Sequence, residues 1–151
     1  MFKLEQGINK LEIAINGYES EDHRAYSNSW GNFYANVVTK DISFESNCCG
    51  IDSVEIDSLK KMLDDFNENN MKENKCFFIV EEGFSIRFYP KGVEYGNVFE
   101  NEKLIEKKEA EIFIAIPDNV FLSRESVKFL LNEKEIIEFS KYISDVISNE
   151  W

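Results

Sequence analysis

The sequence has 151 residues, of which 43% are hydrophobic and 14% aromatic, enough for one domain (1–151) with a sizeable core. Its 29 acidic and 17 basic residues give a formal net charge of −12 at pH 7. This charge disfavours direct binding to nucleic acids or to an anionic membrane, because like charges repel over about 8 Å at physiological salt. No apolar run reaches the roughly 18 residues that a membrane-spanning helix needs.

The N-terminal residues lack the apolar core of a signal peptide, so we expect a cytoplasmic protein. Cys48, Cys49 and Cys76 cannot all pair, and adjacent cysteines rarely bond to each other, which fits a reducing compartment. The acidic surface has two interpretations. It either keeps a cytosolic protein soluble or attracts a basic protein partner.

The first half of the chain is predicted to form a meander of three strands followed by a helix. Alternating apolar and polar residues place the strands at 11–16, 33–39 and 42–46, with Lys40-Asp41 as a hairpin turn. Asp57 is the predicted N-cap of the helix, which ends before the polar stretch 67–74. The apolar stripe of this helix consists of Leu59, Met62, Leu63 and Phe66.

The second half is predicted to form further strands and a C-terminal helix. The strands are expected at 76–81, 85–89, 112–116 and 127–131. Residues 93–108 form either a ragged strand pair or an exposed loop, and we favour a strand near 97–104. Asn132 and Glu135 have the spacing of a capping box at the start of the last helix. The apolar stripe of that helix consists of Ile136, Phe139, Ile143, Val146 and Ile147.

Strands that occur in runs favour an α+β fold with a mainly antiparallel sheet of about seven to nine strands and two helices packed against it. Strand 112–116 has apolar residues on both faces, so the sheet either curves onto itself or meets a partner there. The oligomeric state stays open. The sequence contains no repeat or linker, and we expect a single domain.

No residue pattern typical of catalysis or of a metal site occurs in the sequence. The single histidine, His23, lies in a polar loop, and the cysteines lack the spacing of a zinc site. There is no Gly-x-Ser-x-Gly elbow and no phosphate-binding glycine loop. Acid–base chemistry by two carboxylates is compatible with the composition, but no pair stands out. We therefore expect no enzymatic activity, no cofactor and no metal.

Two loop regions combine aromatic and acidic side chains, a composition typical of protein-binding patches. The candidate partner-binding residues are Glu19, Glu21, Asp22 and Tyr26 in the first region and Glu94, Tyr95, Glu100 and Glu102 in the second. The alternative is that the aromatic side chains pack back against their own loops. For Trp30, next to a predicted strand, we favour this alternative.

A family resemblance rests on a series of stretches that follow one another along the chain. They are Leu11 to Glu19, Ser29-Trp30, Phe33 to Val38, Ser58 to Leu63, Phe78 to Phe88, Ile112 to Ile116, and Val127 to Leu131 with the helix after it. In this order they resemble the WapI-type immunity proteins of bacterial polymorphic toxin systems, over roughly residues 8–147. The resemblance implies a cytosolic antidote that binds and blocks a toxin domain, often a nuclease, made by the same strain.

Another class of function is also compatible with the sequence. The chain can be interpreted as a stand-alone ligand-binding or regulatory α+β module without enzymatic activity. The neighbouring gene distinguishes the two, because a large secreted protein with a variable C-terminal domain encoded directly upstream would favour the immunity protein.

Overall fold

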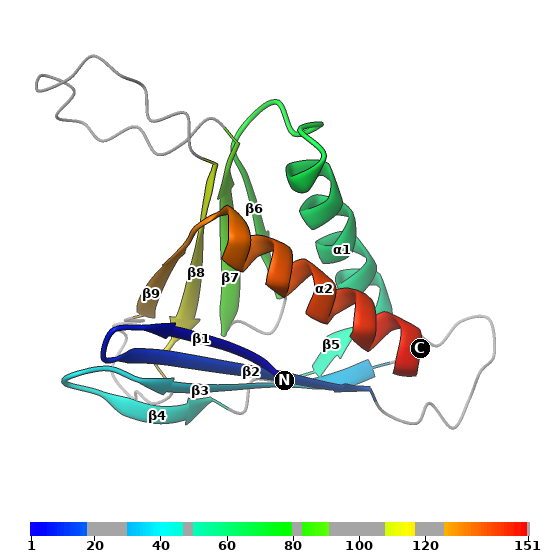
Figure 1. Ribbon diagram of the computed structural model, residues 1–151. Coiled ribbons are helices and arrows are strands. Elements are labelled where there is room, and N and C mark those ends of the chain that lie inside the picture. The colour runs from blue at the N-terminus through cyan, green and yellow to red at the C-terminus, as the bar shows by residue number, and fades with distance from the viewer. Residues whose placement is uncertain (18–29, 47–49, 80–82, 91–107, 117–125, 151) are drawn as a thin grey trace, which may run out of the picture.

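A computed structural model describes residues 1–17, 30–46, 50–79, 83–90, 108–116 and 126–150 of the chain (Figure 1). Within these ranges the chain forms nine strands and two α-helices. The elements are β1 (Phe2–Gln6), β2 (Asn9–Gly17), β3 (Trp30–Val38), β4 (Ser43–Ser46), β5 (Gly50–Asp52), α1 (Ser53–Asn67), β6 (Lys75–Phe78), β7 (Phe84–Tyr89), β8 (Glu109–Ala115), β9 (Ser126–Leu131) and α2 (Glu133–Glu150). The expected strand near 97–104 lies outside the described residues.

The strands form two antiparallel sheets. This confirms the α+β class, but the single sheet predicted from the sequence is in fact two. The first sheet has the order β1-β2-β3-β4, with β5 also paired to β3, and the second has the order β6-β7-β8-β9. In Figure 1 the second sheet rises steeply from the first, and both helices lie in the angle between them. The side chain of Gln6 links the two sheets, because its amide donates a hydrogen bond to the carbonyl oxygen of Leu130.

The first sheet contains two tight hairpins, one between β1 and β2 and one between β3 and β4. Gln6 pairs with Asn9, so only Gly7 and Ile8 connect β1 to β2, and Gly7 has the positive φ of 65° that such a turn requires. The predicted hairpin between β3 and β4 is confirmed, with the Thr39 N–H donating to the Ile42 carbonyl at 2.7 Å.

Aromatic side chains join the sheets and a helix into one core. The ring of Phe33 on β3 lies 4.8 Å, centroid to centroid, from the ring of Phe84 on β7. Phe139 on α2 lies 6.3 Å from Phe84 and 4.9 Å from Phe2 on β1. All four side chains are buried. These contacts fix the first sheet, the second sheet and α2 against one another.

The start of α2 is the one predicted from the sequence. The Glu135 N–H donates to Asn132 Oδ1 at 2.9 Å, and the Asn132 N–H donates to Glu135 Oε1 at 3.0 Å, which completes a capping box. The predicted apolar stripe is also confirmed: Ile136, Phe139, Ile143 and Val146 are buried, and Ile147 is partly buried against the core.

The predicted start of the first helix is wrong, because α1 begins at Ser53 and Asp52, not Asp57, is its N-cap. Asp52 Oδ1 accepts a hydrogen bond from the Glu55 N–H at 2.7 Å, and the Asp52 N–H donates to Glu55 Oε1 at 3.1 Å. Asp57 lies one turn further along and is exposed. The earlier start adds the buried Ile56 to the apolar stripe, which extends the packing face by a turn.

The assignment of Asp52 as the N-cap predicts that Asp52 and Asp57 contribute differently to the stability of the fold. Replacing Asp52 with alanine is expected to lower the free energy of unfolding by about 1 kcal/mol, because the Glu55 N–H loses its acceptor. Asp57→Ala is the matched control and should change the stability by less than about 0.5 kcal/mol. Urea unfolding followed by circular dichroism measures both values. Equal losses for the two variants would contradict the assignment of the cap.

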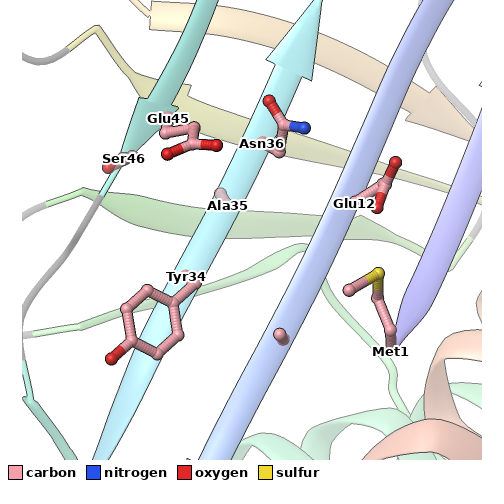
Figure 2. A pocket seen from close by; sticks show the side chains of 8 residues that line it. Met1, Glu12, Tyr34, Ala35, Asn36, Glu45 and Ser46 are labelled. Carbon is pink, nitrogen blue, oxygen red and sulfur yellow. The ribbon is translucent and has the colours of Figure 1, made fainter.

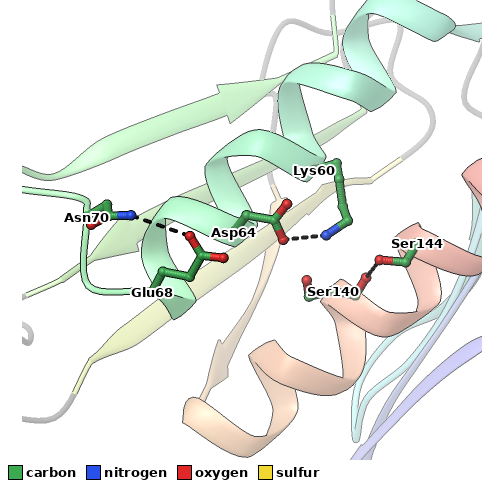
Figure 3. Close-up of polar contacts among 6 residues, drawn as sticks. All are labelled: Lys60, Asp64, Glu68, Asn70, Ser140 and Ser144. Atoms are coloured by element: carbon green, nitrogen blue, oxygen red, sulfur yellow. Dashed lines mark hydrogen bonds and ion pairs between the residues drawn. The ribbon is translucent and has the colours of Figure 1, made fainter.

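The polar contacts drawn in Figure 3 each lie within one helix or at its end. Lys60 forms an ion pair with Asp64 one turn away, and the Ser144 hydroxyl donates to the Ser140 carbonyl at 3.0 Å. An ion pair of this kind contributes only a few tenths of a kcal/mol. Apolar packing therefore holds the helices in place, as where Phe66 of α1 lies 5.4 Å from Phe88 of β7.

Tyr142 on α2 completes the hydrogen bonding of β2. β1 begins at Phe2, opposite Ile13, so β2 continues beyond the end of its neighbour. There the Ile15 N–H donates to the Tyr142 hydroxyl oxygen at 2.7 Å. Burial raises the pKa of Tyr142 above its ordinary value, while the bond from Ile15 acts in the opposite direction.

Replacing Tyr142 with phenylalanine is expected to destabilise the fold by about 1–3 kcal/mol, because the Ile15 N–H would lose its partner. The raised pKa adds a pH dependence: the folded state holds the phenol proton more tightly than the unfolded chain. The contribution of this proton to the stability of the wild type is fully present below pH about 10. It is lost as the pH rises through the pKa of Tyr142 in the folded state. The stability gap between wild type and variant should therefore narrow above pH about 10 in urea titrations. A gap that widens there would contradict this assignment.

Candidate functional site

The first sheet buries one face and turns the other away from the core. On β2 and β3 the buried side chains are Leu11, Ile13, Ile15, Phe33, Ala35 and Val37. Successive side chains of a strand point to opposite faces. The residues that project from the outer face at the centre of these strands are Glu12, Ala14, Tyr34 and Asn36.

Strand register brings two carboxylates into one row on this outer face. Glu12 on β2 pairs with Asn36 on β3, which pairs in turn with Glu45 on β4. Figure 2 shows Glu12 and Glu45 on either side of Asn36. Since neighbouring strands are about 4.8 Å apart, the two residues lie roughly 10 Å apart. On its other side, Glu12 pairs with the exposed Lys3 of β1, so the row runs from Lys3 through Glu12 and Asn36 to Glu45.

A shallow hollow lies beside this row. Its volume is about 230 Å³, and it is lined by Met1, Glu12, Ala14, Tyr34, Ala35, Asn36, Glu45 and Ser46. The small Ala14 pairs with Tyr34 across the strands, which leaves space next to the phenol ring. Tyr34 is 38% exposed and offers both a ring face and a hydroxyl group. We call Glu12, Tyr34, Asn36 and Glu45 the acidic face.

The acidic face suits a cationic group from another protein. A lysine or arginine side chain can contact a carboxylate and the face of an aromatic ring at the same time. The four side chains stand on three paired strands, and a site on such elements is held more exactly in place than one on loops.

The partner-binding residues predicted from the sequence all lie outside the described residues. This applies to Glu19, Glu21, Asp22, Tyr26, Glu94, Tyr95, Glu100 and Glu102. The acidic face was not among the predicted sites, although the alternation of β2 already placed Glu12 on a solvent-facing side. What the sequence did not reveal is the row that Glu12 forms with Glu45, because that row depends on the register of three strands.

In the part of the chain that the structure covers, no group of three or more histidine, cysteine, aspartate or glutamate side chains is arranged to hold a metal ion. Neither α1 nor α2 is long and apolar enough to cross a membrane. No protein-family model matches the chain, and a comparison with the curated proteins finds no match. The function is therefore inferred from the residues and their arrangement.

Proposed function

We propose that the chain is an immunity protein that binds and neutralises a cognate bacterial toxin domain through the acidic face. The observation that carries this proposal is the row of Glu12, Asn36 and Glu45 beside the exposed Tyr34. Tyrosine is enriched at the centres of protein interfaces, and the exposed carboxylate of Glu45 at the end of the row can attract a basic partner. The resemblance of the sequence to the WapI-type immunity proteins supports the same function.

The charge of the proposed partner follows from its chemistry. A nuclease toxin holds the phosphates of its substrate mainly with lysine and arginine side chains. Carboxylates displayed on a sheet are complementary to such a surface and would compete with the phosphates. Complementary charges also accelerate the encounter of the two proteins and fix their orientation. The net charge of −12 adds a long-range attraction to any basic partner.

The alternative function, a stand-alone ligand-binding or regulatory module, has less support. Pockets for small molecules typically have volumes of about 300–1,000 Å³ and enclose most of the ligand. The hollow beside Tyr34 has about 230 Å³, and two larger hollows, of about 340 Å³ beside Lys134 and about 420 Å³ beside Phe78, are wide open to solvent and do not enclose a ligand. A broad contact with another protein fits this geometry better than an enclosed ligand.

Co-expression with a toxin tests the proposal. The toxin domain encoded directly upstream of the gene should stop bacterial growth when expressed alone, and the chain should restore growth. A catalytically inactive form of the toxin domain should then co-purify with the chain in a one-to-one complex. Absence of both rescue and complex would contradict the proposal. A gene located within a metabolic operon instead would favour the alternative module.

A further inference from the structure

The second sheet also has an outer face, and this face carries exposed apolar side chains. Phe78 on β6 is 65% exposed and Leu130 on β9 is 37% exposed, while Phe113 on β8 is partly exposed. The opposite face is the one that packs against the helices, through contacts such as that between Phe88 and Phe66. An antiparallel sheet usually turns polar residues to water, and apolar patches of this kind mark interaction surfaces.

The polar groups of this outer face are arranged by strand. β7 contributes hydrogen-bond donors, with Arg87 at its centre, and β8 contributes the carboxylate of Glu111. Arg87 and Glu111 are direct cross-strand neighbours, yet the guanidinium lies over the ring of Phe113, 4.9 Å from its centroid. No carboxylate in the described ranges lies within ion-pairing distance of Arg87. A hydrogen bond with Tyr89 raises the pKa of Arg87 and so favours its charged form.

We propose that this outer face binds the same face of a second copy of the chain, forming a homodimer whose two-fold axis runs along the boundary between β7 and β8. Such an axis places each outward position of β7 opposite a position of β8 in the partner. Arg87 then faces Glu111 of the partner subunit, and the symmetry makes this contact twice. The same dimer contact covers the apolar side chains of Phe78, Phe113 and Leu130.

The charges of this face are compatible with binding a second copy. Two chains of net charge −12 repel each other, so self-association needs a surface that is locally balanced. The described outward charges of the second sheet are Arg87 and Lys128 against Glu109 and Glu111, which cancel. This inference is independent of the proposed function, since the dimer leaves both acidic faces uncovered.

The size of the face sets the expected strength of the dimer. Four strands about 4.8 Å apart, with about six residues each at about 3.4 Å, cover roughly 400 Å² in outline per copy. Specific interfaces commonly bury about 800 Å² per partner. We therefore expect a weak dimer with a dissociation constant in the micromolar range, which is populated only at higher protein concentration.

Sedimentation velocity tests this directly. Between about 1 µM and 500 µM, a range that brackets a weak interface, the mass should rise from 17.6 kDa towards twice that value. Phe78→Glu should remove the rise. Ile137→Glu is the matched control, because Ile137 is 51% exposed on α2 but lies outside the proposed interface, and this variant should dimerise like wild type. A mass of 17.6 kDa at every wild-type concentration would overturn the proposal.

A mixing experiment distinguishes this geometry from any other dimer. Arg87→Glu places two acidic positions against each other at both contacts, and Glu111→Arg does the same with two basic positions. Each variant alone should stay monomeric. A one-to-one mixture should form a heterodimer, because each contact then pairs opposite charges, and its formation shows that both variants are folded. A mixture that stays monomeric, or a single variant that still dimerises, would contradict the proposed axis.

Discussion

Replacing Phe84 with alanine is expected to lower the free energy of unfolding by about 3–5 kcal/mol. Phe84 is only 2% exposed and stands where both sheets and α2 meet. Its ring lies 4.8 Å from Phe33, 6.3 Å from Phe139 and 6.5 Å from Phe77. These neighbours belong to three different elements that cannot all move inward to fill the space. The substitution should therefore leave a cavity and also loosen the contact between the sheets.

Phe78→Ala is the matched control for this prediction, since it removes the same side chain from the neighbouring strand. Phe78 is mostly exposed on the outer face, so its loss should change the stability by less than about 1 kcal/mol. Urea unfolding at low micromolar protein concentration measures both variants without a contribution from self-association. A loss for Phe84→Ala no larger than that for Phe78→Ala would contradict the position of Phe84 in the core.

The second large effect is expected on binding. Reversing both charges of the acidic face, with Glu12→Lys and Glu45→Lys together, should weaken the complex with the inactive toxin domain by about 100-fold or more. Each reversal removes an attraction to the proposed basic partner and adds a repulsion. Because both positions lie on the solvent-facing side of the sheet, the variant should keep the stability of the wild type. Biolayer interferometry with immobilised toxin domain measures the change.

A second double reversal separates the acidic face from the overall charge. Glu133→Lys with Glu138→Lys changes the net charge by the same amount on α2, where both residues are exposed. This variant should weaken the complex by no more than about threefold, through the loss of long-range attraction alone. Equal losses for the two double variants would show that the acidic face is not the contact.

Local signals in the sequence predicted those parts of the fold that depend on nearby residues. The capping box of Asn132 and Glu135 was predicted because both partners lie within one turn. The start of α1 was missed because Asp52 and Asp57 are both acceptable caps, and only the burial of Ile56 separates them. β1 is absent from the prediction because Phe2 and Leu4 alone make a very short alternating pattern.

The sequence did not predict which strands pair with one another. Alternation predicts which side chains share a face, but not which strand lies next to which, so the division into two sheets was not foreseen. Strand 112–116 illustrates this. Its sequence is apolar on both faces, and the structure places Ile112 and Ile114 in the core and Phe113 beneath Arg87 on the outer face. The acidic face likewise needed the register of β2, β3 and β4 before Glu12 and Glu45 could be seen together.

The most direct test of a charge-driven toxin inhibitor is the association rate constant with the inactive toxin domain, measured by stopped flow at increasing salt. Raising the ionic strength from about 0.01 M to about 1 M shortens the screening length from about 30 Å to about 3 Å. We predict that the rate constant falls at least about tenfold over this range, and that the reversal of Glu12 and Glu45 flattens the dependence. A rate constant that does not change with salt would contradict the proposed role of the acidic face.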